Sequence, residues 1–266
     1  MIAFAPAVIL AGVAIALLGG ASAGAGGEVR LLGSSVKPKR AFFDSVKGVR
    51  ITFRLDSTEP VDASVRIRRA GSEMKRFRFG QVAPRSFRAA VWDGVTERGE
   101  AAADGAYRVF VKPAGAAPLR AGRFWLRGHI YPVRGPHSFR GDIGEFGAPR
   151  SGGRVHEGFD INAACGTKLV AVRSGRVVER GYDPVLYGNY LLIKGRNQRR
   201  TYFYSHLIKP AVPKRGEQVK TGQRVGEVGR TGNARYVPGC HLHFEIRRRG
   251  HPIDPEPDLR GWDRYS

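Results

Sequence analysis

Short segments in which polar and apolar residues alternate recur along this sequence, and they constrain its fold more than any other feature. Alternation with a period of two places side chains on opposite faces of an extended strand, whereas a helix needs apolar residues three and four positions apart. Between residues 40 and 113 such segments are separated by turns rich in glycine, aspartate and proline. They are Val49–Leu55, Val61–Ile67, Phe77–Phe79, Phe87–Trp92 and Tyr107–Val111. Strands at this spacing predict a small β-sandwich.

From Ile130 onward the chain changes to glycine-rich loops between short apolar runs. The runs are Leu169–Val172, Gly175–Val178, Tyr190–Ile193, Thr201–Tyr204 and His243–Ile246. Ser174 and Gly175 predict a two-residue hairpin turn between the first two runs. No segment from Ile130 onward shows helical periodicity. We therefore expect an all-β protein with a second β domain after the sandwich.

The composition indicates a folded protein with a large excess of positive charge. Of the 266 residues, 42% are hydrophobic and 26% are charged, and the formal net charge is +22. The hydrophobic share excludes a disordered chain. The charge favours a polyanionic partner, which could be nucleic acid, an anionic membrane or an acidic wall polymer.

The first 27 residues carry no charged side chain. The apolar run Val8–Leu18 is followed by Ala21-Ser22-Ala23, a pattern that predicts a signal peptide over residues 1–23. The positive residues that usually precede such a run are missing, so an uncleaved anchor is the alternative. The run is short for a membrane span, which favours cleavage. In either case the chain is expected to leave the cytosol, and this counts against nucleic acid as its partner.

The chain has two cysteines, Cys165 and Cys240. An even number in an exported chain favours a disulfide, and metal ligation by thiolate is the alternative. On a strand, the side chain of Cys240 would point away from the face that carries His241 and His243. This orientation favours the disulfide.

Histidines and a carboxylate come from three separated segments of the second half. They are His156, Asp160, His206, His241 and His243. Burying neighbouring imidazoles is costly unless something binds or uses them. Zinc in a hydrolytic site takes three nitrogen or oxygen ligands and leaves one position for a water, whose pKa then falls towards neutrality. Two histidines and one carboxylate would fill these places, and the other histidines could move protons or stabilise an oxyanion. We therefore expect one zinc ion.

Three motifs carry a resemblance to a known family: His156-x-x-x-Asp160, the stretch Tyr204–Leu207, and His241-x-His243. In this order they resemble the lysostaphin-like zinc metallopeptidases of family M23, which cut peptide bridges in bacterial peptidoglycan. Supporting stretches are Tyr131–Gly135, Phe146–Arg150, Tyr187–Tyr190, Gly229–Asn233 and Ile253–Pro255. The resemblance runs from about residue 129 to 259 and implies a compact antiparallel β fold with the metal in a narrow groove.

The resemblance also implies roles for single residues. His156, Asp160 and His243 would be the zinc ligands. His241 would act as the general base or steady the transition state, and His206 would lie beside it in a similar role.

Further positions receive weaker expectations from the same resemblance. Asn189 would contact the substrate in the groove, and a bridge between Cys165 and Cys240 would tie the loop after the ligand Asp160 to the strand of His241. We expect the remaining histidines in surface loops, and these are His129, His137 and His251.

The first half carries a resemblance of its own. Val91–Gly94 and Asp104–Val109 resemble the turns that close successive hairpins in the immunoglobulin-like domain of flagellar hook-capping proteins. Trp92 and Tyr107 are then core aromatics. The expected organisation is a signal peptide over 1–23, a flexible lead-in over 24–39, an Ig-like β-sandwich over 40–113, a linker over 114–128, an M23-like peptidase domain over 129–259 and a C-terminal tail over 260–266. An edge strand that leads into the second domain is the alternative for residues 114–128.

These features predict a secreted zinc metalloendopeptidase that hydrolyses peptidoglycan. It would be an extracytoplasmic, cell-wall-associated monomer whose partners are peptidoglycan and associated anionic wall polymers. Nucleic acid is not expected as a partner, and a membrane is expected only if the N-terminal segment is uncleaved. The alternative is a non-catalytic wall-binding adaptor or an activator of another hydrolase, as in relatives that have lost ligands. All five site positions are present, which favours the enzyme.

Overall fold

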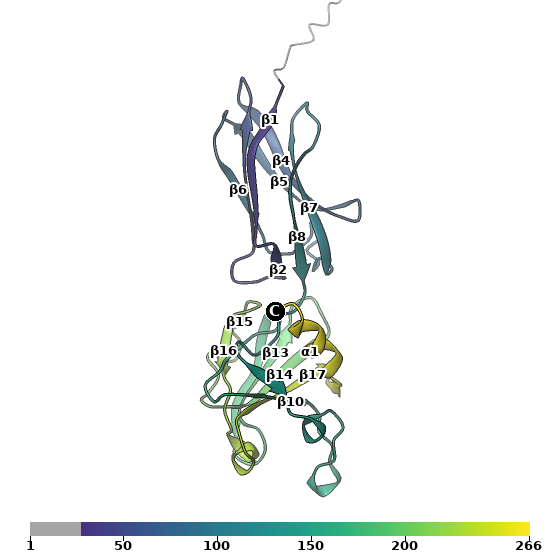
Figure 1. Cartoon of the computed structure of the whole chain (residues 1–266), viewed down its shortest axis with the longest axis vertical. Coiled ribbons are helices and arrows are strands. Elements are labelled where there is room, and N and C mark those ends of the chain that lie inside the picture. The colour runs from purple at the N-terminus through teal and green to yellow at the C-terminus, as the bar shows by residue number, and fades with distance from the viewer. Residues whose placement is uncertain (1–27) are drawn as a thin grey trace, which may run out of the picture.

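The computed structural model describes residues 28–266 as two stacked halves built almost entirely of strands (Figure 1). Strands account for 51% of the structure and helix for 8%, so the predicted all-β class is confirmed. The predicted signal peptide lies outside the described residues. No helix among residues 28–266 is long and apolar enough to cross a membrane.

The N-terminal half is a sandwich of two sheets. One sheet has the order β1-β3-β6 and the other β2-β8-β7-β4-β5, and the pairing is antiparallel except between β2 and β8. The strands are β1 (Arg30–Lys37), β2 (Arg40–Phe42), β3 (Val49–Asp56), β4 (Val61–Arg69), β5 (Ser72–Val82), β6 (Arg88–Trp92), β7 (Gly105–Pro113) and β8 (Leu119–Arg127). The sandwich agrees with the prediction, whereas its resemblance to the immunoglobulin-like domain stays a prediction.

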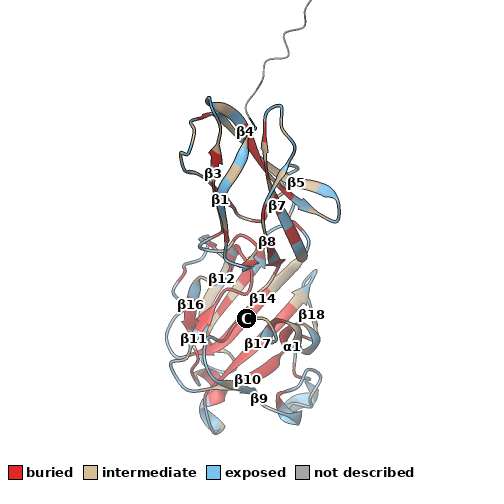
Figure 2. Ribbon diagram, turned by 45° about the horizontal axis from the view of Figure 1, so that its top comes forward, coloured by how far each residue is buried: buried red, intermediate tan, exposed pale blue. Residues whose placement is uncertain are grey.

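Alternating residues build the core of this sandwich (Figure 2). Along β3 the side chains of Val49, Ile51, Phe53 and Leu55 are buried, because every second residue faces the opposite sheet. Trp92 and Tyr107 lie within 5.3 Å of each other, measured between ring centroids, and both are buried in the core. Their expected role as core aromatics is confirmed.

Two segments that we had placed outside the sandwich are strands of it. The predicted flexible lead-in contains β1, which pairs with β3 and buries Val36. The predicted linker contains β8, which lies inside the five-stranded sheet and buries Phe124 and Leu126. A bulge at Ala121 and Gly122 breaks the alternation of β8, so the sequence indicated this strand only as an alternative to a linker.

The C-terminal half has an eight-stranded sheet, β15-β12-β13-β14-β17-β10-β9 with β18 on β17, and a two-stranded sheet, β11-β16. The strands are β9 (His137–Phe139), β10 (Phe159–Ala163), β11 (Lys168–Val170), β12 (Gly175–Asp183), β13 (Gly188–Gly195), β14 (Arg200–Leu207), β15 (Gln218–Val219), β16 (Arg224–Glu227), β17 (His241–Arg248) and β18 (His251–Ile253). The short helices are η1 (Asp142–Gly144), η2 (Ser151–Gly153), η3 (Gly232–Tyr236) and α1 (Glu256–Asp263). All strand pairs in both sheets are antiparallel, as expected.

The predicted hairpin at Ser174 and Gly175 is wrong. β11 pairs with β16 in the small sheet, and β12 pairs with β13 and β15 in the large one, so the chain changes sheets at this point. A Cβ at Gly175 would lie 2.2 Å from the carbonyl oxygen of Lys194. The glycine therefore serves a close approach of two strands and not a tight turn.

The predicted tail is partly a helix. α1 covers Glu256–Asp263 and buries Leu259 and Trp262 against the core of the C-terminal half. Its eight residues are too few for helical periodicity to stand out in the sequence. The chain then ends close to the junction between the halves (Figure 1), where Arg40 donates a hydrogen bond to the carbonyl of Tyr265.

The junction itself contains a buried carboxylate. Asp44 of the sandwich is buried and forms ion pairs with Arg196, at 2.6 Å, and with Lys220 of the other half. Arg173 lies over the ring of Phe43 at 4.2 Å. These contacts hold the two halves together through charged groups of both.

Candidate metal centre

Two neighbouring strands position a carboxylate beside an imidazole. Asp160 on β10 is the direct antiparallel partner of His243 on β17. His156 lies in the loop before β10, and its backbone NH donates to the carbonyl of Ala148 at 2.9 Å. A Cβ at Gly158 would lie 2.6 Å from Cε1 of His243, so a glycine is required for the loop to approach the strand. The fold thus brings together the three residues that were predicted as zinc ligands.

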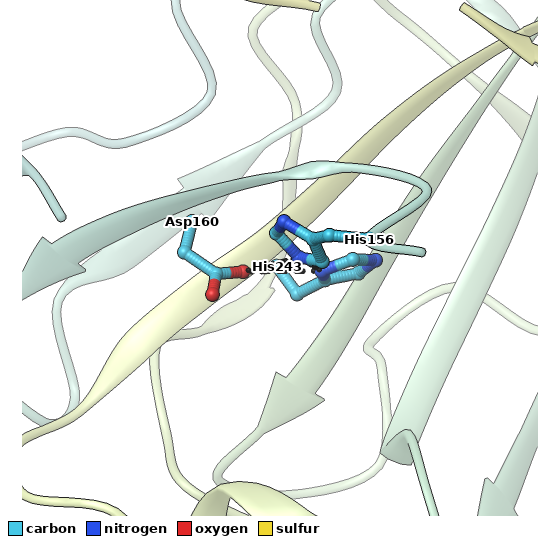
Figure 3. A group of neighbouring side chains, drawn as sticks. All are labelled: His156, Asp160 and His243. Carbon is cyan, nitrogen blue, oxygen red and sulfur yellow. Dashed lines mark hydrogen bonds and ion pairs between the residues drawn. The ribbon is translucent and has the colours of Figure 1, made fainter. Parts of the chain in front are cut away.

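The three side chains converge on one point (Figure 3). Nε2 of His156 lies 2.7 Å from Nδ1 of His243. Oδ1 of Asp160 lies 3.1 Å from Nδ1 of His243 and 3.2 Å from Nε2 of His156. Ligands of a tetrahedral zinc ion, each about 2.0–2.1 Å from the metal, lie about 3.3 Å apart. The three donor atoms, Nε2 of His156, Oδ1 of Asp160 and Nδ1 of His243, form a triangle with sides of 2.7, 3.1 and 3.2 Å, which is close to this size.

Hydrogen bonds on the far side of each imidazole determine which nitrogen faces the triangle. Nδ1 of His156 donates to the carbonyl of Glu145 at 2.8 Å, which leaves the lone pair on Nε2. Nε2 of His243 donates to the carboxylate of Glu245 at 3.0 Å, which directs Nδ1 to the same point. Metal-binding histidines are commonly oriented in this way.

The electrostatics also suit a cation. Burial lowers the pKa of His243, but the carboxylates of Asp160 and Glu245 outweigh it and raise that pKa to about 9. Burial opposes ionisation of Asp160, yet hydrogen bonds with His156 and His243 hold its pKa well below the usual range. A proton therefore occupies the triangle when no metal does, and a divalent cation would replace it. The donor set fits zinc.

Two further histidines lie next to the triangle. The ring centroid of His206 on β14 is 4.9 Å from that of His241 on β17 and 5.9 Å from that of His243. His206 adopts a φ of 60°, a backbone conformation that non-glycine residues rarely take and that clusters at functional sites. Burial, with the charges of neighbouring histidines, lowers the pKa of His206 to about 3, and burial lowers that of His241 to about 4. Both rings are neutral near pH 7.

These two rings present opposite chemistry to the site. Nδ1 of His206 donates to the carbonyl of Thr231 at 2.9 Å, so its Nε2 carries a lone pair. Nδ1 of His241 lies 2.9 Å from Nη1 of Arg140, and a guanidinium can only donate. Nδ1 of His241 is therefore the acceptor, and the neutral ring carries its proton on Nε2.

A groove of about 800 Å³ opens onto these residues. It is lined by all five predicted site residues and by three arginines, Arg140, Arg150 and Arg154. Its carboxylates are Glu157, Asp160 and Glu245, of which the last two are engaged with histidines. Outside the triangle the groove is therefore positively charged.

Asn189 does not line this groove. It is buried, and its Nδ2 donates to the carbonyl of Leu207 at 3.1 Å. Its backbone NH donates a hydrogen bond to Oγ1 of Thr231. The backbone carbonyl of Thr231 in turn accepts the hydrogen bond from Nδ1 of His206. The structure thus gives Asn189 a supporting position in place of the predicted contact with substrate.

A disulfide joins Cys165 to Cys240, with a Cα–Cα distance of 5.3 Å. The predicted pairing is present, and the thiolate alternative is not. The bridge closes a loop across a sequence separation of 75 and holds the segment after β10 against the start of β17. Closing a loop of this length stabilises the folded chain by about 4 kcal/mol.

The sequence reasoning missed several residues of the site. Glu245 lies two positions after His243 on the same face of β17, so the alternation of a strand could have identified it. Arg140 lies in a segment without a motif and could not have been found. The expected exposure of His129 is wrong, because its ring stacks on Trp262 and bonds to the hydroxyl of Tyr202 at 2.6 Å. His137 stacks on Tyr131 and is half-buried, and only His251 is exposed as expected.

Comparison with known proteins agrees with this geometry. Residues 154–255 match peptidase family M23, so this part of the chain is a peptidase M23 domain. A lipoprotein NlpD/LppB homolog of Pseudomonas aeruginosa is 37% identical over 142 residues, which cover 53% of this chain and 43% of that protein. The peptidoglycan DD-endopeptidase ShyA of Vibrio cholerae is 39% identical over 99 residues, which cover 37% of this chain and 22% of that protein.

Among solved structures, the catalytic domain of lysostaphin from Staphylococcus simulans aligns with 30% identity and a TM-score of 0.40. The alignment covers 47% of this chain and 92% of that one. The chain spans less than half the length of the curated relatives that it matches.

Proposed function

We propose that this protein is a zinc metalloendopeptidase that hydrolyses peptide bonds in bacterial peptidoglycan. The observation that carries the proposal is the convergence of three buried donor atoms, from His156, Asp160 and His243, at the floor of a groove. A zinc ion bound there would make a water acidic enough to attack a carbonyl near neutral pH and would polarise that carbonyl. The family match and the printed name of ShyA support this reaction class.

The two neighbouring histidines divide the proton transfers in this proposal. His206 offers a lone pair at Nε2, so it accepts the proton of the attacking water and acts as the general base. His241 offers an NH at Nε2, so it donates a hydrogen bond to the oxyanion that forms on the substrate carbonyl. Arg140 keeps His241 in this tautomer. The assignment separates two roles that the sequence alone left together.

The charge of the groove indicates the kind of peptide that it takes. Arg150 and Arg154 lie on the same loop as His156 and line the groove beside the ligand triangle. Guanidinium groups recognise carboxylates through paired hydrogen bonds. We therefore propose a peptidoglycan peptide with free carboxylates as the substrate, in preference to a neutral glycine bridge.

The location follows from the substrate. We propose that the protein works outside the cytosol, as the uncharged N-terminal segment predicts, with the β-sandwich and the peptidase half as separate modules. β1 and β8 extend the sandwich module to residues 30–127, and α1 extends the peptidase module beyond residue 259.

A second candidate function is the activation of another wall hydrolase. The murein hydrolase activator NlpD of Salmonella typhimurium is 35% identical over 113 residues, which cover 42% of this chain and 28% of that protein. The similarity between that activator and this chain is limited to these 113 residues. The two candidates differ in whether the chain itself breaks bonds.

Purified sacculi distinguish the two. The protein loaded with one equivalent of zinc should release peptides with newly exposed amino groups, and mass spectrometry of those peptides identifies the bond. His243→Ala should lose both the bound zinc and the release, and His251→Ala, an exposed histidine on the neighbouring strand, should lose neither. Zinc binding without any bond cleavage, together with faster digestion by an added amidase, would favour the activator.

A further inference from the structure

The outer face of the five-stranded sheet of the sandwich carries an unusual concentration of positive charge. Its inner face is formed by buried apolar residues such as Val65 and Val109, and alternation directs their neighbours to solvent (Figure 2). We call this outer surface the basic face. Its basic residues are Arg66, Arg68, Arg76, Arg78, Arg108, Lys112, Arg120 and Arg123.

Strand register places these charges directly opposite one another. Arg108 on β7 has Arg68 on one side and Arg123 on the other. In the next row Arg66 on β4 lies opposite Arg76 on β5. Adjacent strands lie about 4.8 Å apart, and successive outward residues of one strand lie about 6.8 Å apart. The arginines therefore form a closely spaced lattice of positive charge.

One carboxylate lies within this lattice, because Glu73 on β5 is the register partner of Arg68 on β4. Among the described residues, Glu73 forms ion pairs with Arg76, at 2.6 Å, and with Arg66, at 3.8 Å. Within residues 28–266, no carboxylate forms an ion pair with Arg68, Arg108 or Arg123. Like charges directly opposite each other destabilise a sheet. A surface that retains them at a cost in stability is typical of a binding site.

Aromatic side chains lie among the charges. Phe110 lies opposite Arg120 and next to Arg66, and Trp125 follows Arg123 on the same face with 51% of its surface exposed. Aromatic side chains supply large apolar contact areas at interfaces, and Trp adds a polar NH that can hydrogen-bond. A membrane-binding surface would instead present several exposed apolar side chains for insertion, and Trp125 is the one large exposed apolar residue on this face.

We propose that the basic face binds a polyanionic glycopolymer of the cell envelope, in which anionic groups repeat along a sugar or polyol backbone. The choice of a wall polymer over nucleic acid rests on the proposed function, whereas the polyanion binding rests on the sheet alone. The face belongs to the sandwich, and the loops that line the groove lie at the far end of the other half (Figure 1). The protein can therefore hold the polymer while the groove remains free for a peptide.

Binding of soluble polymers by the full chain tests the proposal without any need for catalysis. The probes are poly(glycerol phosphate) and polygalacturonate, which distinguish phosphate from carboxylate, together with a DNA oligonucleotide of equal charge and phosphatidylglycerol vesicles. We expect one of the two polymers to bind most tightly at 0.15 M salt. Tighter binding of the DNA or of the vesicles would overturn the proposal.

The decisive variant removes one row of the lattice, Arg68→Gln, Arg108→Gln and Arg123→Gln together. The matched control, Arg199→Gln, Arg248→Gln and Arg249→Gln, removes the same charge from an exposed cluster on the other half. The row variant should bind the polymer at least about tenfold more weakly and the control less than about twofold more weakly. Equal losses in the two variants would reduce the effect to net charge and contradict the proposal.

Thermal unfolding supplies a second readout. Because the row variant relieves repulsion between facing arginines, its melting temperature should be equal to or higher than that of the parent chain. A lower melting temperature would show that the arginines stabilise the sheet, which would contradict a site retained for binding. The single change Arg108→Gln repeats both measurements with the least disturbance of the sheet. None of these measurements involves peptide hydrolysis, so a failure of the enzyme proposal leaves them unaffected.

Discussion

The groove of the C-terminal half and the basic face of the N-terminal half differ in how their charged side chains are neutralised. In the groove, Asp160 and Glu245 are buried, and each hydrogen-bonds to a histidine. On the basic face, Arg108 is exposed and lies between two other arginines. Burial makes an unpaired charge expensive, whereas solvent screens an exposed one. A buried site must therefore satisfy its own charges, whereas an exposed face can leave its charges to solvent or to a ligand.

The largest expected effect distinguishes two neighbouring histidines of the groove. His206→Gln removes the proposed base, because an amide cannot take up a proton, and should lower kcat by about 10²–10⁴-fold. His241→Gln keeps an NH that can reach an oxyanion and should cost less, at most about 10²–10³-fold. Steady-state hydrolysis of a stem peptide, with zinc content measured on the same samples, checks this order. Equal losses, or a greater loss for His241→Gln, would reverse the two roles.

Next in size is the effect of the carboxylate behind His243. Glu245→Gln weakens the orientation of the ligand and should lower zinc affinity by about 10–100-fold. Glu157→Gln, which removes a carboxylate that lines the same groove, is the matched control and should leave the affinity unchanged. Competition with a chromophoric chelator measures both without reference to activity. Unchanged affinity in the Glu245 variant would mean that Glu145 and the strand suffice to orient the ligands.

The arginines of the two regions should affect different quantities. Arg154→Gln in the groove should raise KM for a stem peptide with free carboxylates about tenfold, because a charge-assisted contact is lost. It should leave KM for a neutral glycine peptide unchanged, and it should leave polymer binding unchanged. The row variant of the basic face should show the reverse pattern. If both variants changed both quantities, the two surfaces would act as one.

The smallest effect concerns the junction between the regions. Burial opposes ionisation of Asp44, but hydrogen bonds from Lys220 and Arg196 outweigh it and hold the pKa of Asp44 below its usual value. A carboxyl with a lowered pKa stabilises the folded state above its unfolded pKa of about 4, and this contribution is lost as the pH falls through the folded pKa.

Asp44→Asn should therefore lower the free energy of unfolding by about 2 kcal/mol at pH 7, with a smaller difference from the parent chain near pH 2. Asparagine suits the positive φ of 44° at this position, so the backbone is not strained by the change. Urea unfolding at the two pH values measures the difference. A penalty that stayed constant with pH would assign it to packing instead of charge.

Much of the fold was predictable because strands with one buried face have a period of two. β3, β4 and β7 follow the alternation and were expected at nearly their observed positions. β8 was not assigned to the sandwich, because the bulge at Ala121 and Gly122 shifts its period, and α1 was not expected, because it is too short to show a period. The pairing of β11 with β16 depends on long-range contacts that no local pattern contains.

The all-β class, the five polar residues that line the groove and the cysteine pair could be predicted from the amino-acid sequence, since they depend on local spacing and on residue chemistry. Which nitrogen of each histidine faces the site depends on long-range packing, because the partners are the distant groups Glu145, Thr231 and Arg140. The gathering of separate arginines on one face depends on it as well, because strand order places β4, β7 and β8 side by side. Residue types limit what chemistry is available, and the packing of distant segments determines which atoms carry it out.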